Sequence, residues 1–220
     1  MTTLTVPRAT RAALPSALAL SGLAGAVLFL VGQALLPNLP MSIGKAFPLM
    51  VEHRDQLMAA RLFTAAGAFL LAPAAVGFAR LVPRGARGSR LLRLGAGLFG
   101  IATFSNALSQ AVSGYATFTV TAPGFDTDAG RLVVNRIETG LVAVPLGFWS
   151  IPAFAIGMLL MAAALFRSRR VPTWLPVLLA VGTVLAGALA GRGATVALTQ
   201  APATVALIVM ALRIPDLDES

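Results

Sequence analysis

Long apolar runs alternate with short polar stretches along the whole chain. Each run is close to the ~20 residues that an α-helix needs to cross about 30 Å of hydrocarbon. In lipid only helices and closed barrels satisfy the backbone, and these runs lack the alternating pattern of barrel strands. We therefore predict an all-α polytopic membrane bundle of about six transmembrane helices, over residues 14–36, 57–82, 94–119, 140–166, 174–191 and 194–213.

Composition supports a membrane protein. Hydrophobic residues make up 57% of the 220 residues and charged residues only 11%, whereas soluble domains carry about 25% charged residues. Too few charges remain to cover a globular surface, so membrane lipids are the expected partners of a single transmembrane domain over residues 1–220. The chain has no cysteine, which removes disulfides, thiolate metal sites and redox motifs.

The basic residues predict an orientation. All of them except Lys45 are arginines, and they are spread between the apolar runs, so they do not form a nucleic-acid-binding patch. Of the 17 basic residues, 11 fall on the two termini, the second-to-third connection and the fourth-to-fifth connection, and 6 fall on the other side. The positive-inside rule then places both termini in the cytoplasm, with the protein in the cell membrane.

One charged stretch, "VEHRDQLMAAR" at residues 51–61, needs a separate interpretation. Pro48 suits the first position of a helix, and we expect one helix from there through residue 82, with its first two turns outside the membrane. Four consecutive charged or titratable residues point all round such a helix, so His53 is expected to be solvated. Arg61 lies inside the apolar run. Either it snorkels to the headgroups, or it faces the bundle interior beside an acid or an anionic group.

The third apolar run contains a polar stripe, "SNALSQAVSGY" at residues 105–115. Asn106, Gln110 and Ser113 recur at i, i+4 and i+7, which is one face of a helix. Two interpretations stay open: hydrogen bonds between helices, or the wall of a polar cavity. The stronger polar residues of the other spans, Gln33 among them, also fall in the outer half. The candidate ligand site is an outward-facing polar pocket of Arg61, Asn106, Gln110, Ser113, Glu138 and Gln200.

Glycine, proline and tryptophan patterns give structural expectations. "GAGLFG" at 95–100 has the letters of a dinucleotide fingerprint but lacks the preceding strand that this motif requires. We expect its glycines, and those of "GALAG" at 187–191, to allow close helix approach. Pro145 and Pro152 are expected to kink the fourth span, and Trp149 is expected to pack inside. No motif for a metal, a cofactor or a nucleophile–base pair is present, so none is predicted.

The layout resembles that of short multi-pass membrane proteins common in actinobacteria. The resemblance rests on an outer segment leading into "HRDQLMAARL", a basic loop "PRGARGSRLLRLG" and "RSRRVPTWLP" between later spans. It covers most of the chain, but it concerns layout and composition and implies no activity.

Two classes of function follow. The first is a non-enzymatic membrane protein that binds or moves a small amphiphile, lipid or ion, or that supports a partner membrane protein or a second copy of itself. The lack of catalytic motifs favours this class. The second is an intramembrane enzyme acting on a lipid or isoprenoid, with Glu138 or Asp126 as the acid/base near Arg61, because acid–base chemistry needs only one positioned carboxylate.

Overall fold

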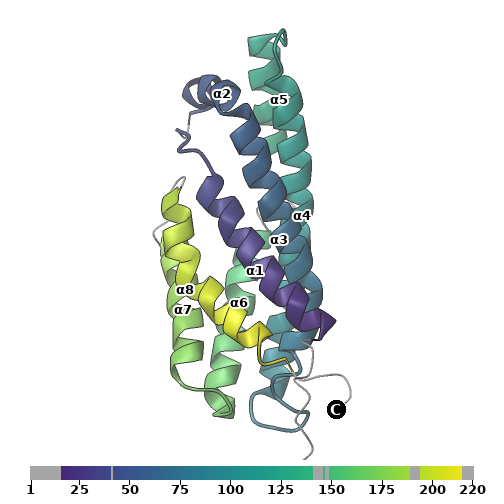
Figure 1. Ribbon diagram of the computed structural model, residues 1–220, viewed down its shortest axis with the longest axis vertical. Coiled ribbons are helices and arrows are strands. Elements are labelled where there is room, and N and C mark those ends of the chain that lie inside the picture. Colours follow the sequence, from purple (N-terminus) through teal and green to yellow (C-terminus); the bar gives the residue numbers. More distant parts are fainter. Residues whose placement is uncertain (1–15, 41, 141–145, 147–148, 189–193, 215–220) are drawn as a thin grey trace, which may run out of the picture.

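The computed structural model describes residues 16–40, 42–140, 146, 149–188 and 194–214 (Figure 1). These residues form helices and no strand, so the all-α class is confirmed. The helices are α1 (Ala17–Leu35), α2 (Ile43–Glu52), α3 (Arg54–Phe78), α4 (Ser89–Val120), α5 (Thr127–Thr139), α6 (Ser150–Ser168), α7 (Trp174–Ala188) and α8 (Ala194–Ala211).

Four of these helices, α1, α3, α4 and α6, are long and apolar enough to cross a membrane, whereas α7 and α8 are shorter apolar helices. The predicted spans at 14–36, 57–82 and 94–119 match α1, α3 and α4 closely. The fourth predicted span, 140–166, overlaps α6, which begins at Ser150; residues 141–145, 147 and 148 lie outside the described residues. Pro152 lies in the first turn of α6, where a proline does not kink a helix. Pro145 lies outside the described residues.

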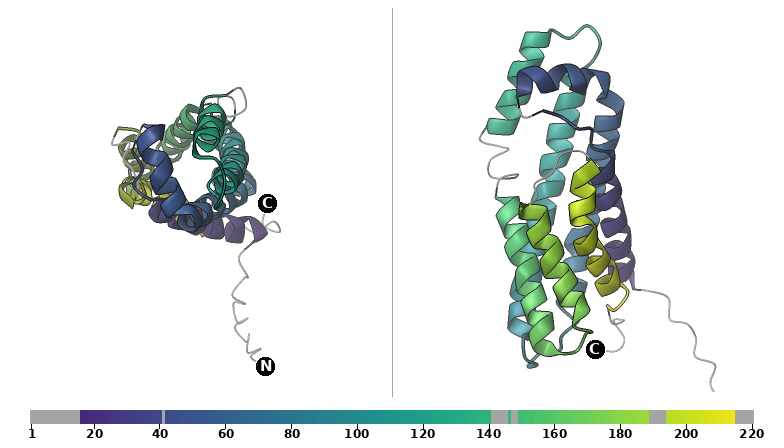
Figure 2. Two further views of the ribbon diagram at one scale, coloured as in Figure 1. Left: turned by 90° about the horizontal axis from the view of Figure 1, so that it is seen from above. Right: turned by 90° about the vertical axis from the view of Figure 1, so that its left-hand side faces the viewer.

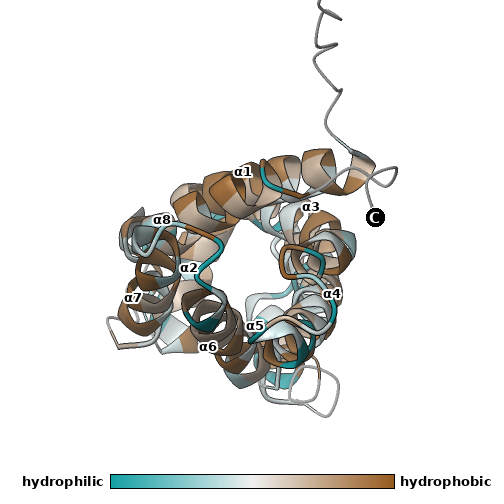
Figure 3. Cartoon of the chain, turned by 90° about the horizontal axis from the view of Figure 1, so that it is seen from below, coloured by the Kyte–Doolittle hydropathy of each residue, from teal (hydrophilic) through white to brown (hydrophobic). Residues whose placement is uncertain are grey.

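The apolar helices, long and short, form a closed ring (Figure 3). Each packs against its neighbours in the order α1, α3, α4, α6, α7, α8 and back to α1. The start of α1 and the end of α8 lie at the same end of this ring, which we call the terminal end (Figure 2). There Ile214 lies against Gly77, and Ala211 lies against Gly22. The arginine-rich α3–α4 connection also lies at the terminal end.

The ring has small residues inside and large apolar residues outside. Its core cluster contains many alanines around Phe78, Phe99 and Met161, all fully buried. The outward faces carry Phe69 at 58% exposure and Leu198 at 75%. Soluble proteins do not cover their surface in this way, whereas lipid solvates such a surface.

Glycines allow close contact between helices, but only some of the glycines that were predicted to do so lie at such a contact. Gly95 lies against the backbone of Gly157, so a Cβ there would come within 2.8 Å of the Gly157 carbonyl oxygen. This confirms the expected close approach for the first glycine of the 95–100 motif. The expectation is wrong for Gly97 and Gly187, because nothing lies within 4 Å of a Cβ added at either. Gly191 lies outside the described residues.

Two amphipathic helices, α2 and α5, lie at the opposite end of the ring and form what we call the cap (Figure 2). A second hydrophobic cluster joins them: Phe47 and Met50 of α2 pack with Val134 of α5 and with Leu57 and Val120. The single helix predicted from Pro48 is therefore wrong. The chain turns at His53, whose φ of −101° and ψ of 27° separate α2 from α3. The turn lets α2 lay its apolar face across the bundle.

Candidate functional site

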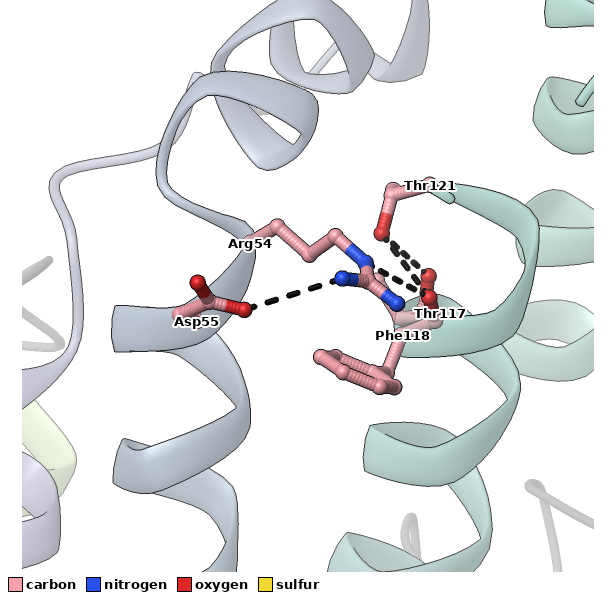
Figure 4. Close-up of polar contacts among 5 residues, drawn as sticks. All are labelled: Arg54, Asp55, Thr117, Phe118 and Thr121. Carbon is pink, nitrogen blue, oxygen red and sulfur yellow. Dashed lines mark hydrogen bonds and ion pairs between the residues drawn. The ribbon is translucent and has the colours of Figure 1, made fainter. Parts of the chain in front are cut away.

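The charged stretch at the start of α3 is partly a structural anchor (Figure 4). The Arg54 guanidinium lies 3.4 Å from the centre of the Phe118 ring, and its Nε donates to the Phe118 carbonyl oxygen at 3.0 Å. The Asp55 Oδ1 atom lies 3.7 Å from Arg54 Nη1, but the Asp55 side chain is 89% exposed, so this ion pair adds little to stability. The expectation of a wholly solvated helix end is therefore wrong for Arg54, which ties α3 to the cap end of α4. His53 is half-buried at the turn.

Arg61 reaches from α3 to the predicted polar stripe. Its Nη1 donates to Gln110 Oε1 at 3.2 Å and to Ser113 Oγ at 3.0 Å. The aliphatic part of its side chain packs on Gly114, where an added Cβ would lie 3.0 Å from the Arg61 Cβ. The side chain therefore runs along the α3–α4 contact, and the guanidinium polarises Gln110.

The polar stripe serves two purposes. Ser113 faces α3, while Asn106 and Gln110 line a cavity inside the ring. The two amides also contact each other, since Gln110 Nε2 lies 3.4 Å from Asn106 Oδ1. Both interpretations of the stripe thus hold, each for a different part of it. Gln110 belongs to both parts and links the Arg61 guanidinium to the cavity.

The cavity occupies about 260 Å³ within the cap-side half of the ring. Its floor belongs to the apolar core and includes Leu71, Met158 and Leu207. Its polar lining comes from every ring helix except α3. These polar residues are Gln33, Asn106, Gln110, Ser150, Thr183, Gln200 and Thr204. None of the described lining residues is charged, so the site is suited to a neutral ligand with hydrogen-bonding groups.

The polar groups of the lining are not equally satisfied. Gln33 is 7% exposed, and its Nε2 donates to Thr64 Oγ1 at 3.5 Å. The Thr183 and Thr204 hydroxyls donate to the carbonyl oxygens of Leu179 and Gln200 on their own helices. The Gln200 Oε1 atom, by contrast, is buried without a hydrogen-bond partner among the described residues. A buried acceptor left unpaired costs about 1–3 kcal/mol, so a donor from a ligand or water is expected there.

The structure brings together most, but not all, of the predicted site residues. Asn106, Gln110 and Gln200 line the cavity, whereas Arg61 and Ser113 lie beside it. Glu138 is in α5, but its side chain lies outside the described parts. Asp126, the other candidate acid, caps α5: its Oδ1 accepts from the Ala129 N–H at 2.7 Å. That bond gives Asp126 a structural role.

Ser150 and Thr183 line the cavity but were absent from the predicted site. The Thr183 hydroxyl bonds to the Leu179 carbonyl of its own helix, and single hydroxyl residues are common in membrane helices, so neither residue stands out in the sequence. The described residues contain no group of three or more histidine, cysteine or acidic residues that could hold a metal ion.

Comparisons with protein-family models, with curated proteins and with solved structures find no significant match to this chain.

Proposed function

We propose that this protein is an integral membrane protein that binds a small neutral amphiphile in the cavity of its helical ring. The observation that carries the proposal is the convergence of Gln33, Asn106, Gln110 and Gln200 on a cavity with an apolar floor, with one amide oxygen that has no partner among the described residues. Hydrogen-bonding groups at one side and apolar groups at the other match an amphiphile. Because the described lining residues are uncharged, they favour a ligand with a hydroxyl or amide head group over an ion.

The proposed membrane arrangement has six crossing helices. We include α7 and α8 because they run beside α1 and α6 in the ring and have apolar sequences (Figure 1). The terminal end carries the arginine-rich connection and faces the cytoplasm, following the positive-inside rule. The cap, with Lys45 and Asp128 exposed, is on the outside of the cell membrane. The cavity then lies in the outer half of the bundle.

Photolabelling of the whole protein in lipid vesicles tests the proposal. The probe is a monoacylglycerol with a diazirine on the first carbons of its chain, next to the head group, and the comparison probe is the fatty acid of the same chain, which carries a charge. We expect the monoacylglycerol to label cavity residues more strongly, and Gln200→Leu or Asn106→Leu to lower that labelling about tenfold, as the loss of one hydrogen bond of about 1.4 kcal/mol would.

Gln56→Leu is the matched control, because Gln56 is exposed and donates to the Leu35 carbonyl oxygen away from the cavity. Its labelling should equal that of the unaltered protein. Cross-links found only on the outward faces of the ring, or equal labelling by the two probes, would contradict the proposal.

A further inference from the structure

Two residues of the cavity lining are also exposed on the outside of the ring. Ile151, in the first turn of α6, lines the cavity and is 70% exposed. Gly187, near the end of α7, lines it as well, is exposed, and has no atom within 4 Å of the position of a Cβ. All the other lining residues are buried or half-buried. Among the described residues, the cavity therefore reaches the surface between α6 and α7.

The surroundings of this opening are apolar. Val184 of α7 is 56% exposed and Ile156 of α6 is 51% exposed, one or two turns from the opening on the terminal side. Trp149 next to it is 62% exposed, so the expectation that it packs inside is wrong. An exposed tryptophan beside exposed aliphatic residues is typical of the membrane interface. These surroundings suit an opening that faces lipid, at the level where the hydrocarbon meets the headgroups.

The size of the cavity limits how a lipid can occupy it. At about 260 Å³ it is slightly smaller than the roughly 300–1,000 Å³ of sites that enclose drug-sized ligands. A lipid head with the first carbons of its chain fits, whereas a whole lipid does not. A tail that leaves between Ile151 and Gly187 stays in the bilayer and needs no further room inside the ring.

The floor of the cavity closes the path through the ring. Leu71, Met158 and Leu207 belong to the apolar core, in which Phe78, Phe99 and Leu165 are each at most 1% exposed. Close packing of this kind leaves no polar route toward the terminal end. A ligand in the cavity therefore has no polar path to the terminal end through the described part of the ring.

We propose that the ligand is a neutral glycerolipid-type molecule of the outer leaflet, which enters sideways between α6 and α7 and keeps its tail in the bilayer while its head bonds to Gln200 and Asn106. This inference rests on the proposed function and adds the route and the lipid class. It predicts that a bulky side chain at the opening slows binding and release without removing the hydrogen bonds.

Gly187→Trp tests the route, and Gly97→Trp is its matched control, since both glycines face open space but Gly97 is on α4 and does not line the cavity. The measurement is the time course of photolabelling by the diazirine monoacylglycerol after it is added to vesicles holding the full chain. We expect Gly187→Trp to slow labelling at least tenfold, and Gly97→Trp to leave it unchanged. Unchanged kinetics in Gly187→Trp would overturn the lateral route.

A second measurement covers the case in which Gly187→Trp does not fold. A nitroxide attached to Gly187→Cys should be relaxed more strongly by oxygen, which concentrates in lipid, than by a water-soluble nickel chelate. Stronger relaxation by the chelate would place the opening in water and overturn the lateral route. If the unaltered protein takes up no probe at all, the proposed function itself fails, which is a distinct result.

Discussion

At the scale of single residues, Arg61 and His53 should differ in their effect on stability. Arg61→Ala removes two hydrogen bonds from a charged group to Gln110 and Ser113, each of a kind worth about 1.5–3 kcal/mol. His53→Ala alters a half-buried side chain at a turn, where changes are usually within about 0.5 kcal/mol. Thermal unfolding in detergent should show a clear loss for Arg61→Ala only. An equal loss for His53→Ala would show that the His53 side chain stabilises the turn as much as Arg61 stabilises the α3–α4 contact.

Gln200 should contribute to ligand binding at some cost to the stability of the protein. Its buried Oε1 has no partner among the described residues, so Gln200→Leu should raise the free energy of unfolding by about 1 kcal/mol while it weakens photolabelling. Thermal unfolding of the ligand-free protein measures the first effect. Gln56→Leu, outside the cavity, should change neither quantity. A destabilised Gln200→Leu would mean that the side chain is structural.

Residue spacing along the sequence predicted part of the candidate site. The i, i+4 spacing of Asn106 and Gln110 places both amides on one helix face whatever the neighbours are, and both line the cavity. The direction of Arg61 depends on how α3 and α4 are rotated against each other, which spacing on one helix does not determine. The binding role of the predicted residues stays a prediction.

At the scale of elements, the α1–α3 contact depends on glycine. A Cβ on Gly67 would collide with the backbone nitrogen of Phe29 and lie 2.8 Å from the Gly25 carbonyl oxygen. Gly67→Ala should therefore destabilise the protein by about 1–3 kcal/mol. Gly97→Ala, in open space on α4, should be neutral or stabilise by up to about 1 kcal/mol through helix propensity. Chemical denaturation of both variants measures the difference, and equal stability would refute this contact.

The cap should loosen when Arg54 is removed. Arg54→Ala loses the contact with the Phe118 ring and the bond to its carbonyl oxygen, and a cation–π contact of this type is worth about 0.5–2 kcal/mol. Hydrogen exchange of residues 43–52 and 127–139 should then speed up, with no change in the ring core. Asp55→Asn is the control, because its carboxylate is 89% exposed. Unchanged exchange in Arg54→Ala would show that the cluster around Phe47 alone holds the cap.

The apolar runs predicted α1, α3 and α4 well, because a membrane helix needs a long run and nothing else. They did not predict the cap helices. Half of an amphipathic helix is polar, so α2 and α5 do not stand out from loops in hydropathy, and Pro48 suggested a helix start at a position inside α2. Their apolar faces can be recognised only when it is known that they pack against the end of α4.

At the scale of the whole molecule, the ring could not be derived from the sequence. Six apolar runs of similar length fit many circular orders, and no run carries a signal for its neighbour. The closure of α8 onto α1 depends on small residues at the contact, such as Gly22 beside Ala211. Loop charges, by contrast, predict a shared side for both termini, and the start of α1 and the end of α8 lie at the same end of the ring (Figure 2).

The orientation of the ring gives the last prediction. Asp128 on the cap is 90% exposed, and Arg87 in the α3–α4 connection is also exposed. The chain has no cysteine, so single cysteines at these positions can be labelled without background. In intact cells Asp128→Cys should react with a membrane-impermeant maleimide, and Arg87→Cys should react only after the cells are opened. The reverse pattern would place the cap in the cytoplasm, and the cavity with its side opening would then serve the inner leaflet.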